Sequence, residues 1–194
     1  MKKILVTMRE GENNNAKTDN IDKRIIDFLE KCKLDVILVP NNIYQAGNIL
    51  ETYFDGVVLT GGGNIYSMGG NLSRDKIESL ILNTAIKKNI PVIGICRGMQ
   101  KIQDYFGISM KETPNNISNV QEIQINNKIQ IVNSFHDYGT FNDNDIFNTW
   151  AKGMDGVIKA IQHKELKISG IMWHPERISP FREYDLNYFM EFFK

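Results

Sequence analysis

Short apolar runs alternate with segments of helical periodicity through the first half of the chain, and this alternation constrains the fold more than any other feature. The apolar runs cover residues 4–7, 36–39, 57–59 and 92–95. Strands that alternate with helices build a parallel sheet, because each connection must cross back over the sheet. We therefore predict an α/β fold with a mainly parallel open sheet and helices on both faces. Asp19 and Asn20 are expected to cap the first helix.

The second half of the chain has the two-residue periodicity of antiparallel strands. Residues 120–132 alternate around Asn126 and Asn127, a pair that is typical of a two-residue hairpin. Further strands are expected at residues 157–161 and 166–173, and a closing helix at residues 184–193, with Leu186, Phe189 and Phe193 buried. Because we find no repeat, low-complexity tract or linker, we predict a single domain over residues 1–194 with an antiparallel extension on its sheet.

Composition and charge disfavour several classes of protein. Hydrophobic residues make up 42% and charged residues 24%, with 23 basic and 23 acidic side chains. This balance is that of a soluble globular protein and gives no overall attraction to nucleic acid or to an anionic membrane. No apolar stretch approaches the ~20 residues of a membrane span, and the apolar start ends at Arg9, too early for a signal peptide. We therefore expect a cytoplasmic protein without nucleic-acid or membrane partners.

A cysteine stands where the strand at residues 92–95 passes into a helix. Gly94 and Gly98 bracket Cys96, so that the backbone can turn sharply and the helix can pack closely on the strand. A thiol at a helix N-terminus lies at the positive end of the helix dipole, which favours the nucleophilic thiolate. The alternative is a small buried core residue, which is what most lone cysteines are.

A histidine and a glutamate follow the apolar run that ends at Met172. In an extended segment, residues two apart face the same side, so Glu176 is expected to accept the ring N–H of His174 while the other ring nitrogen faces a thiol. Pro175 restricts the backbone between them. A base oriented by a carboxylate beside a nucleophile is the arrangement of a hydrolytic triad. The alternative is a structural histidine.

Three consecutive glycines, Gly61, Gly62 and Gly63, follow the apolar run at residues 57–59. Their backbone amides, together with the N–H of Arg97, can point at a developing oxyanion, and one such donor is worth about 3 kcal/mol in the transition state. A flexible turn is the commoner explanation for three glycines taken alone.

In this order along the chain, these motifs resemble those of class I glutamine amidotransferases. The matching stretches are Leu59-Thr60-Gly61-Gly62-Gly63, Gly94-Ile95-Cys96-Arg97-Gly98-Met99-Gln100 and His174-Pro175-Glu176. The Cys-Arg-Gly-x-Gln form of the second is similar to the free-standing γ-glutamyl hydrolase branch, as are Arg74-Asp75 with Glu78 and Val132-Asn133-Ser134 with His136. The resemblance spans nearly the whole chain and implies a flavodoxin-like fold.

The resemblance implies a cysteine hydrolase that acts on a small-molecule γ-glutamyl amide. It assigns Cys96 as the nucleophile, His174 as the general base and acid, and Glu176 as the group that orients His174. The backbone amides of Gly62 and Arg97 would form the oxyanion hole. Contacts with the substrate would fall on Gly61, Gly63, Gln100, Ser134, Phe135 and His136. Neither a metal nor an organic cofactor is implied.

The sequence departs from that branch where the leaving group would be recognised. Asn64-Ile65-Tyr66 stands in place of an acidic residue and a proline-containing stretch, and Asp137-Tyr138 follows His136 where a glutamine is common. The leaving group therefore stays open, and γ-glutamyl-CDP-amidate of bacterial capsule synthesis is one candidate substrate. A glutaminase subunit that supplies ammonia to a separate synthetase is the alternative. A catalytically idle module that binds a γ-glutamyl ligand is a third, and the sequence leaves a homodimer open.

The remaining cysteine and histidines carry no chemistry that the sequence identifies. Cys32 is expected in or near the core and His163 in an exposed turn, whereas His136 is either structural or in contact with substrate. The spacing of cysteines and histidines does not match a zinc site.

Overall fold

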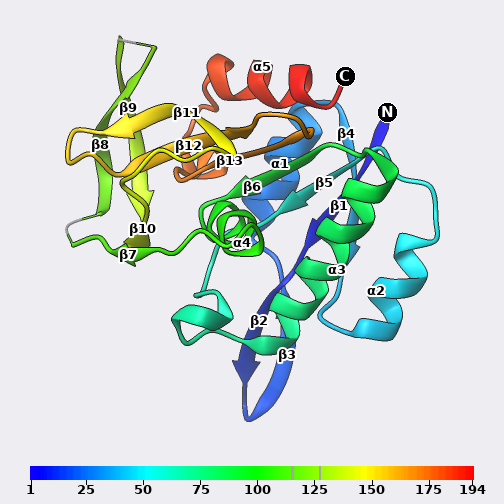
Figure 1. The fold of residues 1–194 in the computed structure, drawn as a ribbon. Helices are drawn as coiled ribbons and strands as arrows, with labels where there is room; N and C mark the ends of the chain where they lie inside the picture. Colours follow the sequence, from blue (N-terminus) through cyan, green and yellow to red (C-terminus); the bar gives the residue numbers. More distant parts are fainter. Residues whose placement is uncertain (115, 127) are drawn as a thin grey trace.

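A nine-stranded sheet forms the centre of the protein in the computed structural model, which describes residues 1–114, 116–126 and 128–194 (Figure 1). The strands of this sheet are β1 (Lys2–Thr7), β4 (Leu34–Val39), β5 (Gly56–Leu59), β6 (Val92–Ile95), β8 (Ile117–Ile125), β9 (Lys128–Phe135), β11 (Phe147–Gly153), β12 (Ile158–His163) and β13 (Ile168–Ile171). Two smaller pairs are β2 (Arg9–Asn13) with β3 (Ala16–Asn20), and β7 (Lys111–Glu112) with β10 (Tyr138–Gly139). The helices are α1 (Lys23–Lys31), α2 (Ile43–Leu50), α3 (Leu72–Lys88), α4 (Arg97–Tyr105) and α5 (Glu183–Phe192), with short 3₁₀ turns η1 (Tyr66–Met68) and η2 (Pro175–Arg177).

The strand order is β4-β1-β5-β6-β13-β12-β11-β8-β9. Strands β4, β1, β5, β6 and β13 pair in parallel, and β12, β11, β8 and β9 continue the sheet in antiparallel pairs. The predicted α/β fold, with a parallel sheet and an antiparallel extension from the second half, is therefore confirmed.

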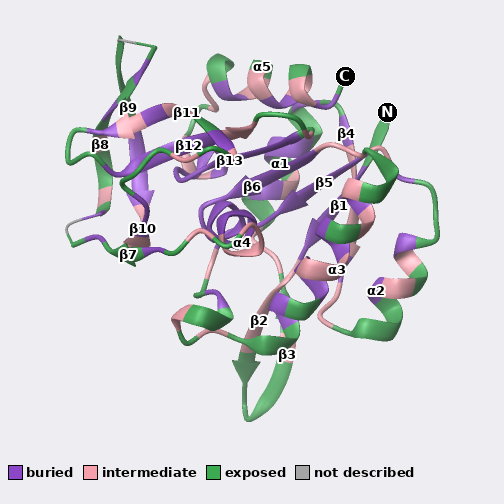
Figure 2. Ribbon diagram, in the orientation of Figure 1, coloured by how far each residue is buried: buried purple, intermediate pink, exposed green. Residues whose placement is uncertain are grey.

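Two hydrophobic clusters cover the two faces of the sheet. Alternation along β1 sends Ile4 and Val6 to one face and Leu5 to the other, because successive strand residues point in opposite directions. The first cluster includes the buried faces of α1 and α5, and the second those of α2, α3 and α4. Buried residues accordingly run through the central strands in Figure 2. Helices on both faces were predicted, and this prediction is confirmed.

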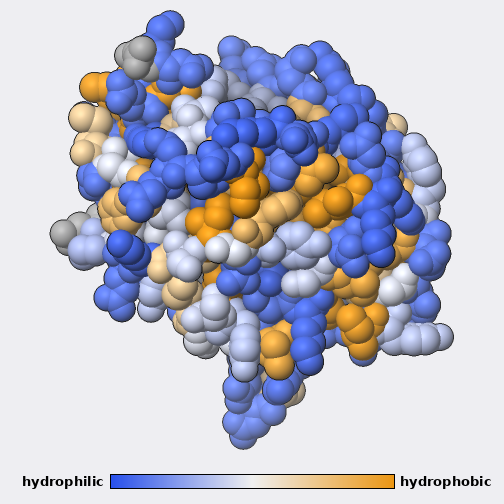
Figure 3. Space-filling view, in the orientation of Figure 1, coloured by the Kyte–Doolittle hydropathy of each residue, from blue (hydrophilic) through white to orange (hydrophobic). Residues whose placement is uncertain are grey.

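The first helix begins later than its sequence predicts. Its N-cap is Asp22, whose carboxylate accepts the backbone N–H of Arg24 at 3.1 Å, rather than Asp19 or Asn20. Asp19 and Asn20 belong instead to β3, which pairs with β2 in a protruding hairpin. This hairpin is polar and mostly exposed, as Figures 2 and 3 show, so it lacks the apolar alternation by which strands are recognised.

Strands β8 and β9 pair as expected up to Ile125 opposite Lys128, but Asn127 of the predicted turn lies outside the described residues. The sequence interpretation included neither α2 nor β11. Phe189 in α5 and Phe193 directly after it are buried as expected, whereas Leu186 is only partly buried. Within the described part of the chain, no helix is long and apolar enough to cross a membrane.

Candidate active site

Three neighbouring parallel strands deliver the candidate residues to one edge of the sheet. Strand β5 leads into the glycine loop, β6 leads into Cys96, and β13 leads through Met172 and Trp173 to His174. The carboxyl ends of adjacent parallel strands meet at one edge, which is where open α/β sheets bind ligands. Segments far apart in sequence therefore converge by strand order alone.

Cys96 occupies a strained turn between β6 and α4. Its backbone has φ 51° and ψ −105°, outside the regions that residues with a side chain favour, and it forms the N-cap position of α4. Its N–H donates to the Ile171 carbonyl at 2.7 Å, and its carbonyl accepts the Gln100 N–H at 3.0 Å. These bonds to β13 and to the helix hold the turn in place.

Two glycines make this turn sterically feasible. A Cβ at Gly98 would lie 2.0 Å from the carbonyl oxygen of Leu59, and one at Gly94 would lie 2.4 Å from the carbonyl carbon of Gly98. Real Cβ atoms do not approach backbone atoms so closely, so α4 can pack on β5 and β6 at this distance only with glycine at both positions. The structure thus has the geometry of a nucleophile elbow.

The imidazole of His174 lies beside the sulfur of Cys96. A Cβ at Gly61 would lie 2.6 Å from Cε1 of His174 and 3.4 Å from Cβ of Cys96, so both side chains approach this glycine. Nδ1 of His174 donates to Oε1 of Glu176 at 2.7 Å, which leaves Nε2 for the thiol. The His-Glu pair forms across the 3₁₀ turn η2 rather than along the extended segment that we predicted.

Asn133 on β9 fixes the backbone of His174. Its Oδ1 accepts the N–H of His174 at 2.7 Å, and its Nδ2 donates to the His174 carbonyl at 2.9 Å. Both residues are buried, so these bonds form away from competing water. Asn133 lies within a stretch that the resemblance identified, but its role depends on a contact between positions 41 residues apart.

His174 is held in its charged form. Burial lowers its pKa, but the charge and hydrogen bond of Cys96 and those of Glu176 outweigh burial and raise the pKa to about 9. The imidazole is therefore protonated at neutral pH.

A pocket of about 240 Å³ opens above the sulfur of Cys96. Its lining residues are Gly62, Gly63, Asn64, Cys96, Gln100, Phe135, His136, Asp137, His174 and Arg177. Of the predicted substrate-binding residues, Gly63, Gln100, Phe135 and His136 lie on its wall. Gly61 and Ser134 do not line it, because Gly61 packs against His174 and the Ser134 hydroxyl faces Lys159 behind the wall.

A buried lysine supports this wall from behind. Nζ of Lys159, on β12, donates to Oδ1 of Asn116 at 2.5 Å and to Nε2 of His136 at 2.7 Å. Because an ammonium group only donates, Nε2 of His136 must accept, and the ring hydrogen lies on Nδ1. Burial and the charge of Lys159 lower the pKa of His136 to about 3, so this histidine is neutral. The sequence interpretation missed Lys159, although a lysine inside the apolar run at residues 157–161 was a signal.

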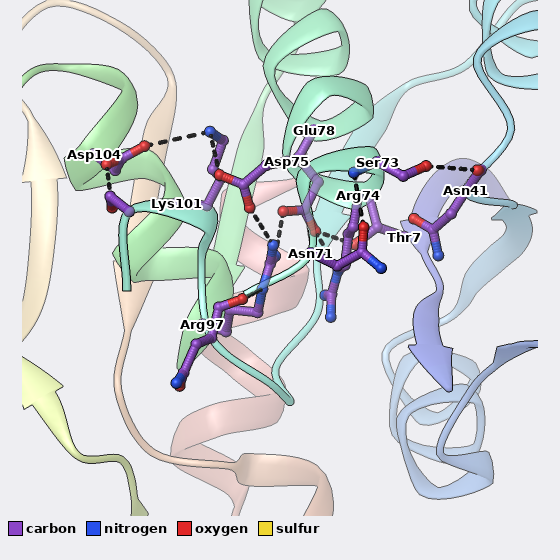
Figure 4. A network of polar contacts seen from close by, with 12 residues as sticks. Thr7, Asn41, Asn71, Ser73, Arg74, Asp75, Glu78, Arg97, Lys101 and Asp104 are labelled. Atoms are coloured by element: carbon purple, nitrogen blue, oxygen red, sulfur yellow. Dashed lines mark hydrogen bonds and ion pairs between the residues drawn. The ribbon is translucent and has the colours of Figure 1, made fainter. Parts of the chain in front are cut away.

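The side chain of Arg97 points away from the pocket into a buried charged network (Figure 4). Its guanidinium pairs with Glu78, donates to Asp75 at 2.5 Å, and donates through Nε to the Asn64 carbonyl at 3.1 Å. Arg74 also bonds Glu78, at 2.9 Å. The Arg74-Asp75 and Glu78 motif on α3 therefore binds the residue that follows the cysteine.

The same network holds the glycine loop. Arg74 donates to the carbonyl oxygen of Gly62 at 2.8 Å and to that of Thr60 at 2.7 Å. Since Arg97 holds Asn64 at the far end of the loop, one cluster ties both ends of the loop to α3 and α4. Buried charges are stable only when paired, and here each is.

Cys32 and His163 lie outside this site. Cys32 is buried in the core as predicted, and burial raises its pKa to about 12. His163 is only partly exposed, because its ring packs against Phe106 and Phe147 and its Nδ1 accepts two backbone N–H groups. No group of acidic, cysteine and histidine side chains among the described residues is suited to hold a metal ion.

Comparison with known proteins assigns the chain to one family. The sequence profile of the glutamine amidotransferase class-I family matches residues 17–194. A gamma-glutamyl-CDP-amidate hydrolase of Campylobacter jejuni is 32% identical over 124 residues, which span 62% of either chain. The glutamine-hydrolyzing component of the GMP synthase of Methanosphaera stadtmanae is 28% identical over 171 residues, covering 79% of this chain and 81% of the relative.

A crystal structure from Thermoplasma acidophilum, assigned provisionally to a GMP synthase component, has the same fold. It superposes with a TM-score of 0.75 at 21% identity and covers 100% of this chain and 93% of the other. The resemblance identified from the motifs is confirmed, since the family profile also covers most of the chain. The protein therefore belongs to the class I glutamine amidotransferase family.

Proposed function

We propose that the protein hydrolyses a γ-glutamyl amide, with Cys96 as the nucleophile. The observation that carries the proposal is the position of Cys96 at the start of α4, next to a charged His174 whose other nitrogen is bonded to Glu176. This arrangement is the generalised triad of a base, its orienting carboxylate and a nucleophile. The adjoining pocket of about 240 Å³ offers room for a glutamyl group.

The proposed reaction has two steps. The Cys96 thiolate attacks the γ-carbonyl carbon, a C–S bond forms, and the tetrahedral intermediate collapses by breaking the C–N bond. The His174 imidazolium gives its proton to the departing nitrogen, which leaves a glutamyl thioester and a neutral imidazole. The neutral imidazole then accepts a proton from water as the water oxygen attacks the thioester carbonyl. The C–S bond breaks, glutamate leaves, and the Cys96 thiolate and His174 imidazolium are restored. Glu176 stabilises the imidazolium whenever it forms.

Backbone amides supply the oxyanion hole in this proposal. The N–H of Arg97 belongs to the first turn of α4, where amides have no partner within the helix. Gly62 lines the pocket with a positive φ of 92°, a conformation that glycine adopts without strain. The network on Arg74 and Arg97 holds the carbonyls of this loop and thereby orients its amides.

The substrate that we propose is γ-glutamyl-CDP-amidate, or a close relative in which the departing nitrogen is bonded to phosphorus. The similarity to the Campylobacter jejuni hydrolase supports this choice. Gln100, Phe135 and His136 would hold the glutamyl group from the pocket wall. The alternative is a glutaminase subunit that passes ammonia to a separate synthetase, which the similarity to the glutamine-hydrolyzing component of GMP synthase favours.

A substrate panel tests the proposal and separates the alternatives. Purified protein is offered a γ-glutamyl phosphoramidate, a γ-glutamyl alkylamide and free glutamine, and the released glutamate is measured. We expect hydrolysis of the γ-glutamyl amides by wild type and by Cys32→Ala, and none by Cys96→Ala. Turnover of glutamine that requires an added synthetase would favour the alternative. Full activity of Cys96→Ala would exclude both.

Covalent labelling provides a second, independent test. A glutamine analogue with an electrophilic carbon at the γ position should modify one cysteine, located by mass spectrometry of peptides. Cys96 should react, whereas Cys32 should remain unmodified because its thiol is buried with a raised pKa of about 12. Modification of Cys32 in preference to Cys96 contradicts the assigned nucleophile.

A further inference from the structure

A second cavity adjoins the Cys96 pocket, and none of the proposed catalytic groups accounts for it. It has a volume of about 400 Å³ and is lined by Arg24, Asn119, Asn133, Phe135, Arg177 and Ile178. Phe135 and Arg177 line the Cys96 pocket as well, so the two spaces share part of their wall. A substrate whose glutamyl group fills the pocket above Cys96 can therefore place its leaving group in this second cavity.

Three arginines surround one aspartate beside this cavity. Asp22 accepts hydrogen bonds from Arg24 at 2.7 and 3.0 Å, and it lies 3.8 Å from the guanidinium of Arg9 and 3.9 Å from that of Arg177. The hydrogen bond from Arg24 outweighs burial and lowers the pKa of Asp22 to about 2, so Asp22 carries one negative charge at neutral pH. Even with the Glu176 carboxylate 3.6 Å from Arg177, the three guanidinium groups outnumber the two carboxylates, which leaves an excess of positive charge.

Two of these arginines retain unused hydrogen-bonding capacity. In residues 1–114, 116–126 and 128–194, Nε of Arg9 and Nε of Arg177 are buried without a hydrogen-bond acceptor. The nearest carboxylate oxygen to Nε of Arg177 is Oε1 of Glu176 at 3.6 Å, and this oxygen already accepts the imidazole N–H. Buried N–H groups without acceptors are uncommon in proteins, and Arg177, which lines both cavities, is placed to donate to a bound anion.

The positions of the guanidinium groups suit a leaving group that starts at the sulfur of Cys96. Arg177 lies over the ring of Phe135 at 5.2 Å, which fixes the plane of its guanidinium between the two cavities. Arg9 lies at the oxyanion loop, because a Cβ at Gly62 would be 2.7 Å from its Nε. Arg24 lines the outer cavity. Positive charge therefore extends from the scissile bond outward.

We propose that Arg24 and Arg177 form a subsite for a leaving group that carries phosphate, with Arg9 adding positive charge at Asp22. The planar guanidinium group binds two phosphate oxygens at once, which makes arginine well suited to phosphate recognition. An uncharged amine gains nothing from these groups, so the subsite selects phosphoramidate substrates over γ-glutamyl alkylamides. This inference rests on the proposed function, because a leaving group exists only if a γ-glutamyl amide is cleaved.

A kinetic comparison of two substrates tests the subsite. For wild type, Arg24→Gln, Arg177→Gln and the double variant, kcat/KM is measured with a γ-glutamyl phosphoramidate and with γ-glutamyl ethylamide. The ratio of the two values should fall about tenfold or more per arginine, since each variant removes charge-assisted hydrogen bonds to phosphate and a tenfold loss corresponds to about 1.4 kcal/mol. Lys23→Gln is the matched control, because Lys23 is an exposed cation on the same helix, and its ratio should equal that of wild type.

A binding measurement keeps the subsite testable apart from catalysis. Inorganic pyrophosphate and cytidine diphosphate are titrated calorimetrically into wild type and the same variants at two salt concentrations. We expect binding that weakens with salt and is lost in the double variant but not in Lys23→Gln. Binding of pyrophosphate without any hydrolysis by wild type would retain the subsite and refute the proposed function. Hydrolysis with an unchanged substrate ratio, or equal binding by the double variant, would refute the subsite alone.

Discussion

Removal of the Glu78 carboxylate should destabilise the buried charged network that joins the glycine loop to α4. Glu78 is fully buried and pairs with both Arg74 and Arg97, and Thr7 donates a further hydrogen bond to it at 3.0 Å (Figure 4). Burial opposes ionisation of Glu78, but the two arginines outweigh it and lower the pKa of the carboxyl. Glu78→Ala therefore leaves two buried guanidinium groups short of one anion.

The magnitude follows from the cost of an unpaired buried charge. Breaking a buried ion pair by removing one partner costs about 3–5 kcal/mol, a large part of the ~5–15 kcal/mol that stabilises a typical domain. For a chain of 194 residues, this loss corresponds to a fall in Tm of about 6–20 °C. Glu78→Gln retains the shape and one acceptor, so we expect an intermediate loss of stability.

Thermal unfolding followed by circular dichroism measures these losses, and urea unfolding checks that the transition stays two-state. The control is Glu191→Gln, which removes an exposed carboxylate paired with Lys194 and should leave Tm within error of wild type. At a temperature where Glu78→Gln is folded, its kcat should also fall, because Arg74 holds the carbonyl oxygen of Gly62. A Tm for Glu78→Ala equal to that of the Glu191→Gln control would refute the reasoning.

Three further predictions concern packing, pH and the lysine behind the pocket. Gly98→Ala should lower the free energy of unfolding by at least about 1–3 kcal/mol and abolish hydrolysis, because the added Cβ would meet the Leu59 carbonyl. The control is Gly47→Ala on α2, whose added Cβ meets nothing within 4 Å. In urea unfolding this control should be neutral or stabilising. The value of kcat/KM should decline as pH rises through about 9. Below its raised pKa, His174 keeps the proton that the departing nitrogen needs, and above it that proton is lost. A flat profile to pH 10 contradicts this role. Lys159→Met should raise the pKa of His136, because the charge of Lys159 lowers that pKa in wild type. The variant should also increase KM more than it changes kcat. An unchanged titration of His136, followed by NMR, would contradict the contact.

Much of the fold was predictable because it depends on local periodicity. The apolar runs of β1, β5 and β6 and the glycines around Cys96 specify a strand, a sharp turn and a helix within a few residues of one another. The polar hairpin β2-β3 escaped prediction because its residues do not alternate between core and solvent. The N-cap of α1 was misplaced for the same reason, since the hairpin contains the residues that were expected to cap the helix.

The sequence by itself determined the family and singled out Cys96, His174 and Glu176, because each lies in a short motif whose residue types suit one kind of chemistry. Only the tertiary structure decided which residues surround them. Asn133 reaches the backbone of His174 although β9 and β13 are not neighbours in the sheet. The pairing of β12 with β13 brings Lys159 behind the pocket, and the packing of α1 near η2 gathers three arginines around Asp22. Apart from the local pair of Asp22 and Arg24, these contacts join positions that are distant in sequence, and their geometry is set by how strands and helices pack.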